Sequence, residues 1–170
     1  MIDSDNRHKN WEKSIGPRVE ELEDRGFDLE AFYLYSATIE FMLQSTIENQ
    51  EKWIKHLVSK SKLRFEGITE KKLLEQPLGV LIKIFAQYCD DKQLISKLNE
   101  FNSFRKIITH RLLNNSIESL NDKAKQKRLT YYSLIKKLAE YNLFMIQKQI
   151  VKNKRKISAR EVKKTKSKSS

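Results

Sequence analysis

Turn-forming residues are scarce in this chain, which has four glycines and two prolines among 170 residues. Sandwiches, barrels and glycine-built phosphate loops all depend on glycine or proline at their turns, so this composition leaves little room for them. Leu, Lys, Glu and Gln, which form helices readily, are abundant. The sequence therefore predicts an all-α fold, a single bundle of about five helices.

Positive charge is concentrated at the C-terminal end of the chain. The formal net charge is +12, and residues 152–170 alone hold nine Lys or Arg and one Glu. A segment of that composition cannot bury enough apolar surface to order itself, so we expect a disordered basic tail after a domain that spans residues 1–151. The core of that domain is expected at about 25–151. The tail is either a solvated extension of the last helix or an electrostatic arm for phosphate backbones.

Apolar periodicity and punctuation by Gly, Pro, Asp and Asn divide the chain into helices. The expected elements are 11–24 with a break at Gly16 and Pro17, 28–61 as the spine of the bundle, a short helix opened by Thr69, then 80–89, 92–113 and 130–151. The lysine-rich stretch 121–128 is expected to be a linker.

Several classes of function are disfavoured by what the sequence lacks. No run approaches the ~20 apolar residues that span a bilayer, and the N-terminus has no apolar signal core, so we expect a cytoplasmic protein without a membrane partner. The single cysteine, Cys89, excludes an intramolecular disulfide framework, and we expect it to be a small, buried hydrophobic residue. The three histidines, His8, His56 and His110, lie on different segments, so we expect neither a metal site nor a cofactor. No nucleotide-binding or hydrolase motif is present.

The segment 98–115, LNEFNSFRKIITHRLLNN, carries the candidate chemistry. On a helix, Arg105 and His110 lie about 140° apart and ~7.5 Å along the axis. Between them the polar residues Asn102, Lys106 and Thr109 occupy one side of the wheel. One helix does not bring Arg105 and His110 together, and a second copy related by two-fold symmetry makes their convergence easier.

Arg105, four intervening residues and His110, on a helix that follows an apolar helical hairpin and precedes an Asn turn, resemble the R-x4-6-H signature of the HEPN superfamily of small helical bundles. Gly26, Ala31 and Glu40 resemble that family's early helix, so the likeness covers roughly residues 25–150. The resemblance implies a metal-independent endoribonuclease with a toxin–antitoxin, phage-defence or RNA-processing role. It also implies a homodimer with a cleft between the two motif helices, and a cognate antitoxin or other protein as a further partner.

The resemblance assigns roles that suit these residue types. Arg105 would hold phosphate oxygens and His110 would transfer protons, while Asn102 and Thr109 would orient the site. The RNA's own 2′-hydroxyl would be the nucleophile. Phosphates outside the reacting group would be gathered by a set of basic residues, namely Lys106, Arg111, Lys123, Lys125, Lys127 and Arg128.

Other interpretations remain open. Lys106 stands where many family motifs carry Asn, Asp or His, and this departure favours a catalytically inactive dimerisation and protein-interaction module. A nucleic-acid binder that relies on the basic tail is a third possibility. Arg105 and His110 also fit ordinary solvated positions on a helix face, where the helix dipole favours His110 and Arg111 near the C-terminus.

Overall fold

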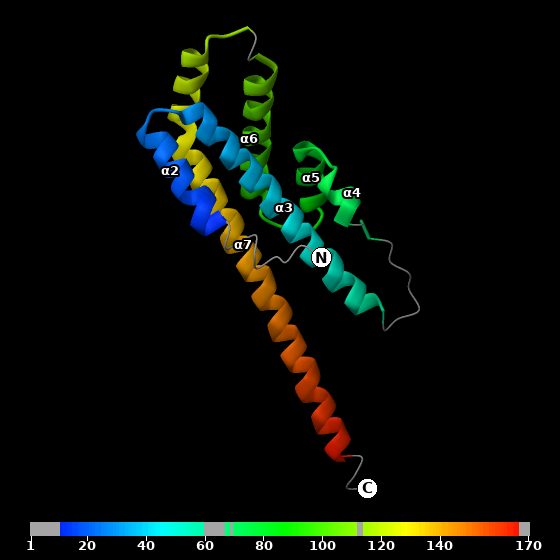
Figure 1. Ribbon diagram of the computed structural model, residues 1–170. Coiled ribbons are helices and arrows are strands. Elements are labelled where there is room, and N and C mark those ends of the chain that lie inside the picture. The colour runs from blue at the N-terminus through cyan, green and yellow to red at the C-terminus, as the bar shows by residue number, and fades with distance from the viewer. Residues whose placement is uncertain (1–10, 60–66, 69, 112–113, 167–170) are drawn as a thin grey trace. The chain divides into compact units, whose positions relative to one another are not determined.

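The computed structural model describes residues 11–59, 67–68, 70–111 and 114–166, and the regular secondary structure of these residues is entirely helical (Figure 1). A π-helical turn, η1 (Trp11–Ile15), precedes six α-helices. They are α2 (Gly16–Asp24), α3 (Asp28–Val58), α4 (Glu70–Leu74), α5 (Leu78–Phe85), α6 (Lys92–Arg111) and α7 (Ile117–Lys166). The all-α prediction is confirmed. Among the described residues no helix is both long and apolar enough to cross a membrane.

The chain divides into two compact units, Met1–Leu138 and Ala139–Ser170. In the first unit α3 packs against α2, α4 and α5, and α5 packs in turn against α6. The core of this unit contains an aromatic cluster centred on Phe32, which is 1% exposed. The rings around Phe32 are those of Tyr33, Phe101, Phe104 and Tyr131, with centroids 5.3–5.8 Å away. The cluster ties α3, α6 and the first part of α7 together.

The turn between α2 and α3 depends on a glycine. Gly26 has φ +76°, a left-handed conformation that costs other residues free energy. The Gly26 amide donates to the Glu23 carbonyl and the Phe27 amide donates to the Leu22 carbonyl, which is the Schellman pattern of helix termination. Asn121 of α7 holds the same turn, because its Nδ2 donates to the Gly26 carbonyl and its Oδ1 accepts from the Leu29 amide.

The expected linker at 121–128 is helical, and the prediction of a linker there was wrong. The segment contains no Gly or Pro, and its Ala, Lys, Gln and Arg residues are good helix formers. Leu120 and Ala124 are buried and begin the apolar face that continues through Tyr131. Ser116 begins the helix, with its Oγ accepting from the Ser119 amide. A stretch that charge alone marks as a linker is therefore part of the bundle.

Smaller differences concern helix ends. The spine, α3, ends at Val58 rather than about 61. The helix expected at 80–89 is α5, which starts earlier, at Leu78, because Pro77 adopts the extended conformation that precedes a helix, and it ends at Phe85 before a turn. The helix expected to continue to 113 is described as far as Arg111, and residues 112–113 lie outside the described part.

The second unit consists of the later part of α7. Its backbone is helical to Lys166, through most of the segment for which the sequence predicts a tail, and side chains are described as far as Val151. Four large apolar side chains in this unit are about half exposed or more, namely Leu143, Phe144, Ile150 and Val151.

Candidate functional site

Arg105 is held against α3 by a carboxylate. Its Nη2 lies 3.6 Å from Oε2 of Glu40, and the two side chains are 35% and 26% exposed. Tyr33 lies on the same side of α3, seven residues before Glu40. Burial raises the pKa of the Tyr33 hydroxyl, and the positive charge of Arg105 opposes that shift. Arg105 therefore lies within electrostatic range of a tyrosine and a glutamate that both come from α3.

Only one end of the Arg105 guanidinium takes part in this ion pair. No described residue accepts a hydrogen bond from Nη1 or Nε. Because a guanidinium offers its donors in a planar fork, the edge that Glu40 does not use remains suited to a phosphate or carboxylate. The ion pair restricts the side chain without occupying all of its donors.

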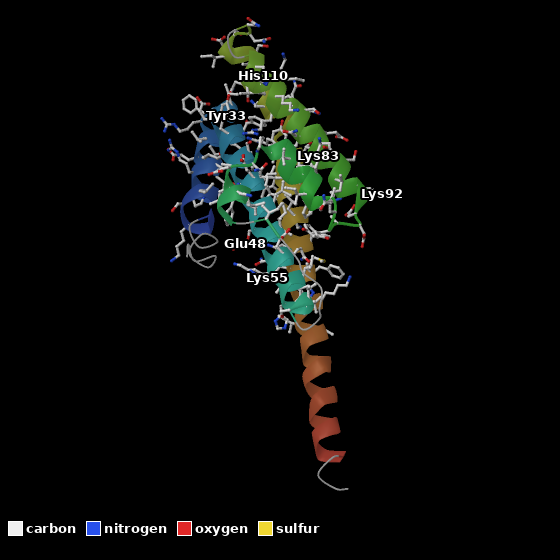
Figure 2. All side chains as sticks on the ribbon, turned by 90° about the vertical axis from the view of Figure 1, so that its right-hand side faces the viewer. Tyr33, Glu48, Lys55, Lys83, Lys92 and His110 are labelled. Carbon is white, nitrogen blue, oxygen red and sulfur yellow. The ribbon has the colours of Figure 1, made fainter. Side chains whose placement is uncertain are left out.

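His110 lies near the C-terminal end of α6, and its side chain is exposed (Figure 2). Among the described residues, none forms a hydrogen bond or ion pair with its imidazole. His110 lies five positions after Arg105 on the helix, which turns the two side chains about 140° apart. Arg105 faces α3 whereas His110 faces solvent, so one copy of α6 presents the two groups on different sides.

The two expected supporting residues occupy different environments. Asn102 is 8% exposed, and its Nδ2 would lie 3.0 Å from a Cβ at Gly79, so it packs against α5 at a position where glycine leaves it room. Thr109 is exposed, and its Oγ1 donates to the Arg105 carbonyl one helical turn earlier. The polar face expected on α6 is therefore divided between a buried amide and an exposed hydroxyl.

Only some of the basic residues expected to bind RNA phosphates have exposed side chains. Lys106, Lys125 and Lys127 are exposed and Lys123 is half-buried. The side chain of Arg111 lies outside the described residues.

Arg128 differs from the expectation, because it is engaged within the fold. Its Nη1 lies 3.7 Å from Oε2 of Glu23 on α2 and 3.9 Å from Oδ1 of Asp28 on α3. The Asp28 side chain is 1% exposed, and neither of its oxygens accepts a hydrogen bond within the described residues. A buried carboxylate needs a nearby positive charge, so Arg128 is a structural residue that links three helices.

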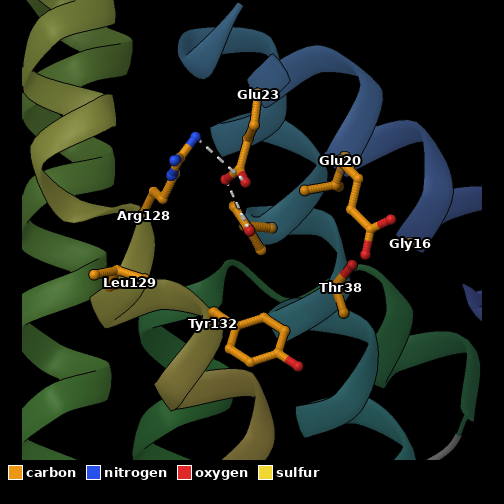
Figure 3. A pocket seen from close by; sticks show the side chains of 9 residues that line it. Gly16, Glu20, Glu23, Thr38, Arg128, Leu129 and Tyr132 are labelled. Atoms are coloured by element: carbon orange, nitrogen blue, oxygen red, sulfur yellow. Dashed lines mark hydrogen bonds and ion pairs between the residues drawn. The ribbon is translucent and has the colours of Figure 1, made fainter. Parts of the chain in front are cut away.

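Two of the pockets formed by the described residues of the first unit have neither Arg105 nor His110 in their lining. One, of about 330 Å³, opens beside α2 (Figure 3). In its lining, Tyr35 donates a 2.9 Å hydrogen bond to Glu23. Its polar lining comprises Glu20, Glu23, Tyr35, Thr38, Arg128 and Tyr132. The other, of about 490 Å³, lies between α6 and α7, with Phe101, Phe104, Tyr131 and Leu134 as its apolar lining.

No group of three or more His, Cys, Asp or Glu side chains in the described ranges could hold a metal ion. Cys89 is buried, and its Sγ lies 3.9 Å from the carbonyl oxygen of Asp91. Burial of this kind suits a structural cysteine.

The sequence pattern did not reveal the charge network of Glu23, Asp28 and Arg128, because Arg128 lies 100 residues or more from its two acidic partners. It did single out Glu40, through the family resemblance, but without assigning it to Arg105. The spacing of Tyr33 and Glu40, two turns apart on the spine, was the available signal that this side of α3 is polar.

No family model matches this chain, and neither the curated proteins nor the solved structures include a match. What is established of the chain is its fold, an all-helical bundle.

Proposed function

We propose that this chain is a metal-independent endoribonuclease whose active site forms between two copies of α6. The observation that carries the proposal is the state of Arg105, a half-buried guanidinium that Glu40 holds at one end, on the same helix as an exposed histidine. Such an arrangement supplies a positioned cation and an accessible imidazole, which are the two groups that metal-free phosphodiester cleavage requires.

The division of the two groups between different sides of α6 explains why two copies are needed. A symmetric pair of α6 helices can place Arg105 of one copy beside His110 of the other, which a single helix cannot do. In this arrangement the RNA phosphate lies between the free edge of the guanidinium and the imidazole. Exposed Lys106, at the rim, adds attraction for the neighbouring phosphates.

The reaction is an attack of the RNA 2′-hydroxyl on its own phosphate. His110 accepts the proton of the 2′-hydroxyl as the new O–P bond forms. The bond between phosphorus and the 5′-oxygen breaks, and the 5′-oxygen takes a proton from solvent water, so the products are a 2′,3′-cyclic phosphate and a 5′-hydroxyl. Arg105 stabilises the charge that develops on the non-bridging oxygens. DNA lacks the nucleophile, so cleavage is restricted to RNA.

The test compares two exposed histidines of the same chain. The variant His110→Ala is expected to lose cleavage of a mixed-sequence RNA in EDTA, by about 10²–10⁴-fold for removal of a general acid or base. His56→Ala, on α3, is the matched control and should cleave as the wild type does. Equal rates for the wild type and His110→Ala would remove the proposal.

A second candidate function is a catalytically inactive module that dimerises and binds a protein. The observation that favours it is the same ion pair, because Glu40 partly neutralises the charge that a ribonuclease needs on Arg105. This candidate predicts a stable dimer in sedimentation experiments and no RNA cleavage at low or high salt. A wild-type protein that cleaves RNA in EDTA would exclude it.

A further inference from the structure

The second unit of the chain presents an apolar face that takes no part in the RNA cleavage proposed for Arg105 and His110. Leu143 and Ile150 are 59% and 48% exposed, and both lie on one stripe of α7 together with Ala139 and Ile146. The spacing along this stripe alternates between four and three residues, as it does where one helix packs along another. Soluble proteins seldom leave such a stripe uncovered.

The segment that follows the stripe is strongly basic. Residues 152–170 carry nine Lys or Arg and one Glu, and the helical backbone continues from the stripe to Lys166. An occupant that follows the helix axis therefore meets an apolar surface first and positive charge next. We propose that this surface, the stripe of Ala139, Leu143, Ile146 and Ile150 with the adjoining basic turns, binds an acidic amphipathic helix of another protein.

A second copy of this chain satisfies only half of that description. It could offer the apolar stripe, but residues 139–170 contain only two acidic residues, Glu140 and Glu161. Two such helices side by side would repel each other along their basic segments. Charge complementarity therefore favours a partner whose apolar stripe leads into Asp and Glu.

RNA and a lipid surface each fit less well. RNA neutralises lysines but gains nothing from exposed leucine and isoleucine side chains. A membrane-surface helix needs its apolar side chains on one face and its charges on the other. Here the ammonium of Lys148 lies 5.7 Å from the centre of the Phe144 ring, on a different side of the helix from the stripe, so a charged and an apolar side chain share that side.

The experiment uses the full chain and three synthetic helical peptides with leucines at heptad spacing. The peptides differ only in their outer positions, which carry Glu, Gln or Lys. We expect fluorescence anisotropy to show the highest affinity for the Glu peptide, a lower affinity for the Gln peptide and the lowest for the Lys peptide. Salt should weaken binding of the Glu peptide. Leu143→Asp should weaken binding of the Glu peptide at least ~10-fold, because it removes an apolar contact. Gln147→Asp, an equal charge change at an exposed polar position, should leave the affinity within about threefold of the wild type.

Four results would overturn the proposal. The first is equal binding of all three peptides, and the second is equal binding of the Glu peptide by Leu143→Asp and the wild type. The third is no binding of any peptide. The fourth is a dimer in sedimentation that Leu143→Asp dissociates while no peptide binds. Binding of RNA or of phosphatidylglycerol vesicles that depends on Leu143, without peptide binding, would assign the surface to those occupants instead. Leu143 has no part in the proposed RNA cleavage, so Leu143→Asp should retain that activity, and the two proposals can fail separately.

Discussion

Arg105 on α6 and Glu40 on α3 form an ion pair, with Nη2 of the guanidinium 3.6 Å from Oε2 of the carboxylate. The pair connects the helix that carries the candidate chemistry to the spine of the bundle. Because the pair uses one end of the guanidinium, it can fix the direction of Arg105 while leaving donors for a ligand.

Replacing Glu40 by Gln tests whether the carboxylate positions Arg105. The pair is partly exposed, so the free energy of unfolding should change by no more than about 1 kcal/mol. RNA cleavage should fall by roughly tenfold, because a phosphate-binding group that is less well placed stabilises the transition state less. Glu48→Gln, which removes an exposed i,i+4 partner of Lys52 on the same helix, is the control. An unchanged cleavage rate in Glu40→Gln would show that Glu40 has no positioning role.

Replacing Phe32 by Ala tests the core that joins α3, α6 and α7. Phe32 is 1% exposed and lies among four aromatic rings, so its loss should lower the free energy of unfolding by about 3–5 kcal/mol in urea titrations. Phe27→Ala removes the same side chain at a position that is 43% exposed and should cost less than about 1 kcal/mol. Similar losses at the two positions would contradict the assigned core.

Three tyrosines predict that the protein is destabilised by alkali. Burial raises the pKa of Tyr35, Tyr88 and Tyr131 above the ordinary value of about 10. Above that pH the unfolded chain ionises these hydroxyls while the folded chain keeps them neutral. The stability they contribute is therefore present below about pH 10 and is lost as the pH rises further. Urea unfolding on either side of this pH measures the loss.

Tyr131→Phe isolates one of these groups. The Tyr131 hydroxyl is buried and makes no hydrogen bond within the described residues, so its removal should change stability little at neutral pH. The variant should lose less stability than the wild type in alkali. Tyr132→Phe, at a side chain that is 59% exposed, should follow the wild-type curve. Alkaline losses that are the same in all three proteins would argue against this origin of the effect.

Local patterns in the sequence predicted the helices well. The near-heptad apolar spacing of the spine predicts a core face that includes Leu29, Phe32, Ile39, Leu43, Ile47 and Ile54. The first five are buried, and Ile54 is partly exposed. The same spacing extended the face to Leu57, which is 37% exposed near the helix end. Periodicity describes the angle of a side chain around its own helix, but it does not say where along the axis the neighbouring helix ends.

The differences between expectation and structure have a common physical origin in contacts between distant segments. The charged composition of 121–128 predicted a linker, although Ala124 and the neighbouring Leu120 are buried. Charge also marked Arg128 as a phosphate ligand, although Glu23 and Asp28 occupy it. The polarity of Asn102 suggested a functional face, whereas the space beside Gly79 accommodates it in the interior. A single sequence does not contain these pairings in its local spacing.

The most direct test of the central claim is whether Arg105 and His110 act across two copies. Arg105→Ala and His110→Ala, co-expressed with different affinity tags and purified through both tags, give dimers with one copy of each variant. Each mixed dimer has one complete site of two, so its RNA cleavage in EDTA should recover to about half of the wild-type rate, while each variant alone is inactive. A purified mixed dimer that cleaves no faster than its inactive parents would contradict an active site shared between two copies.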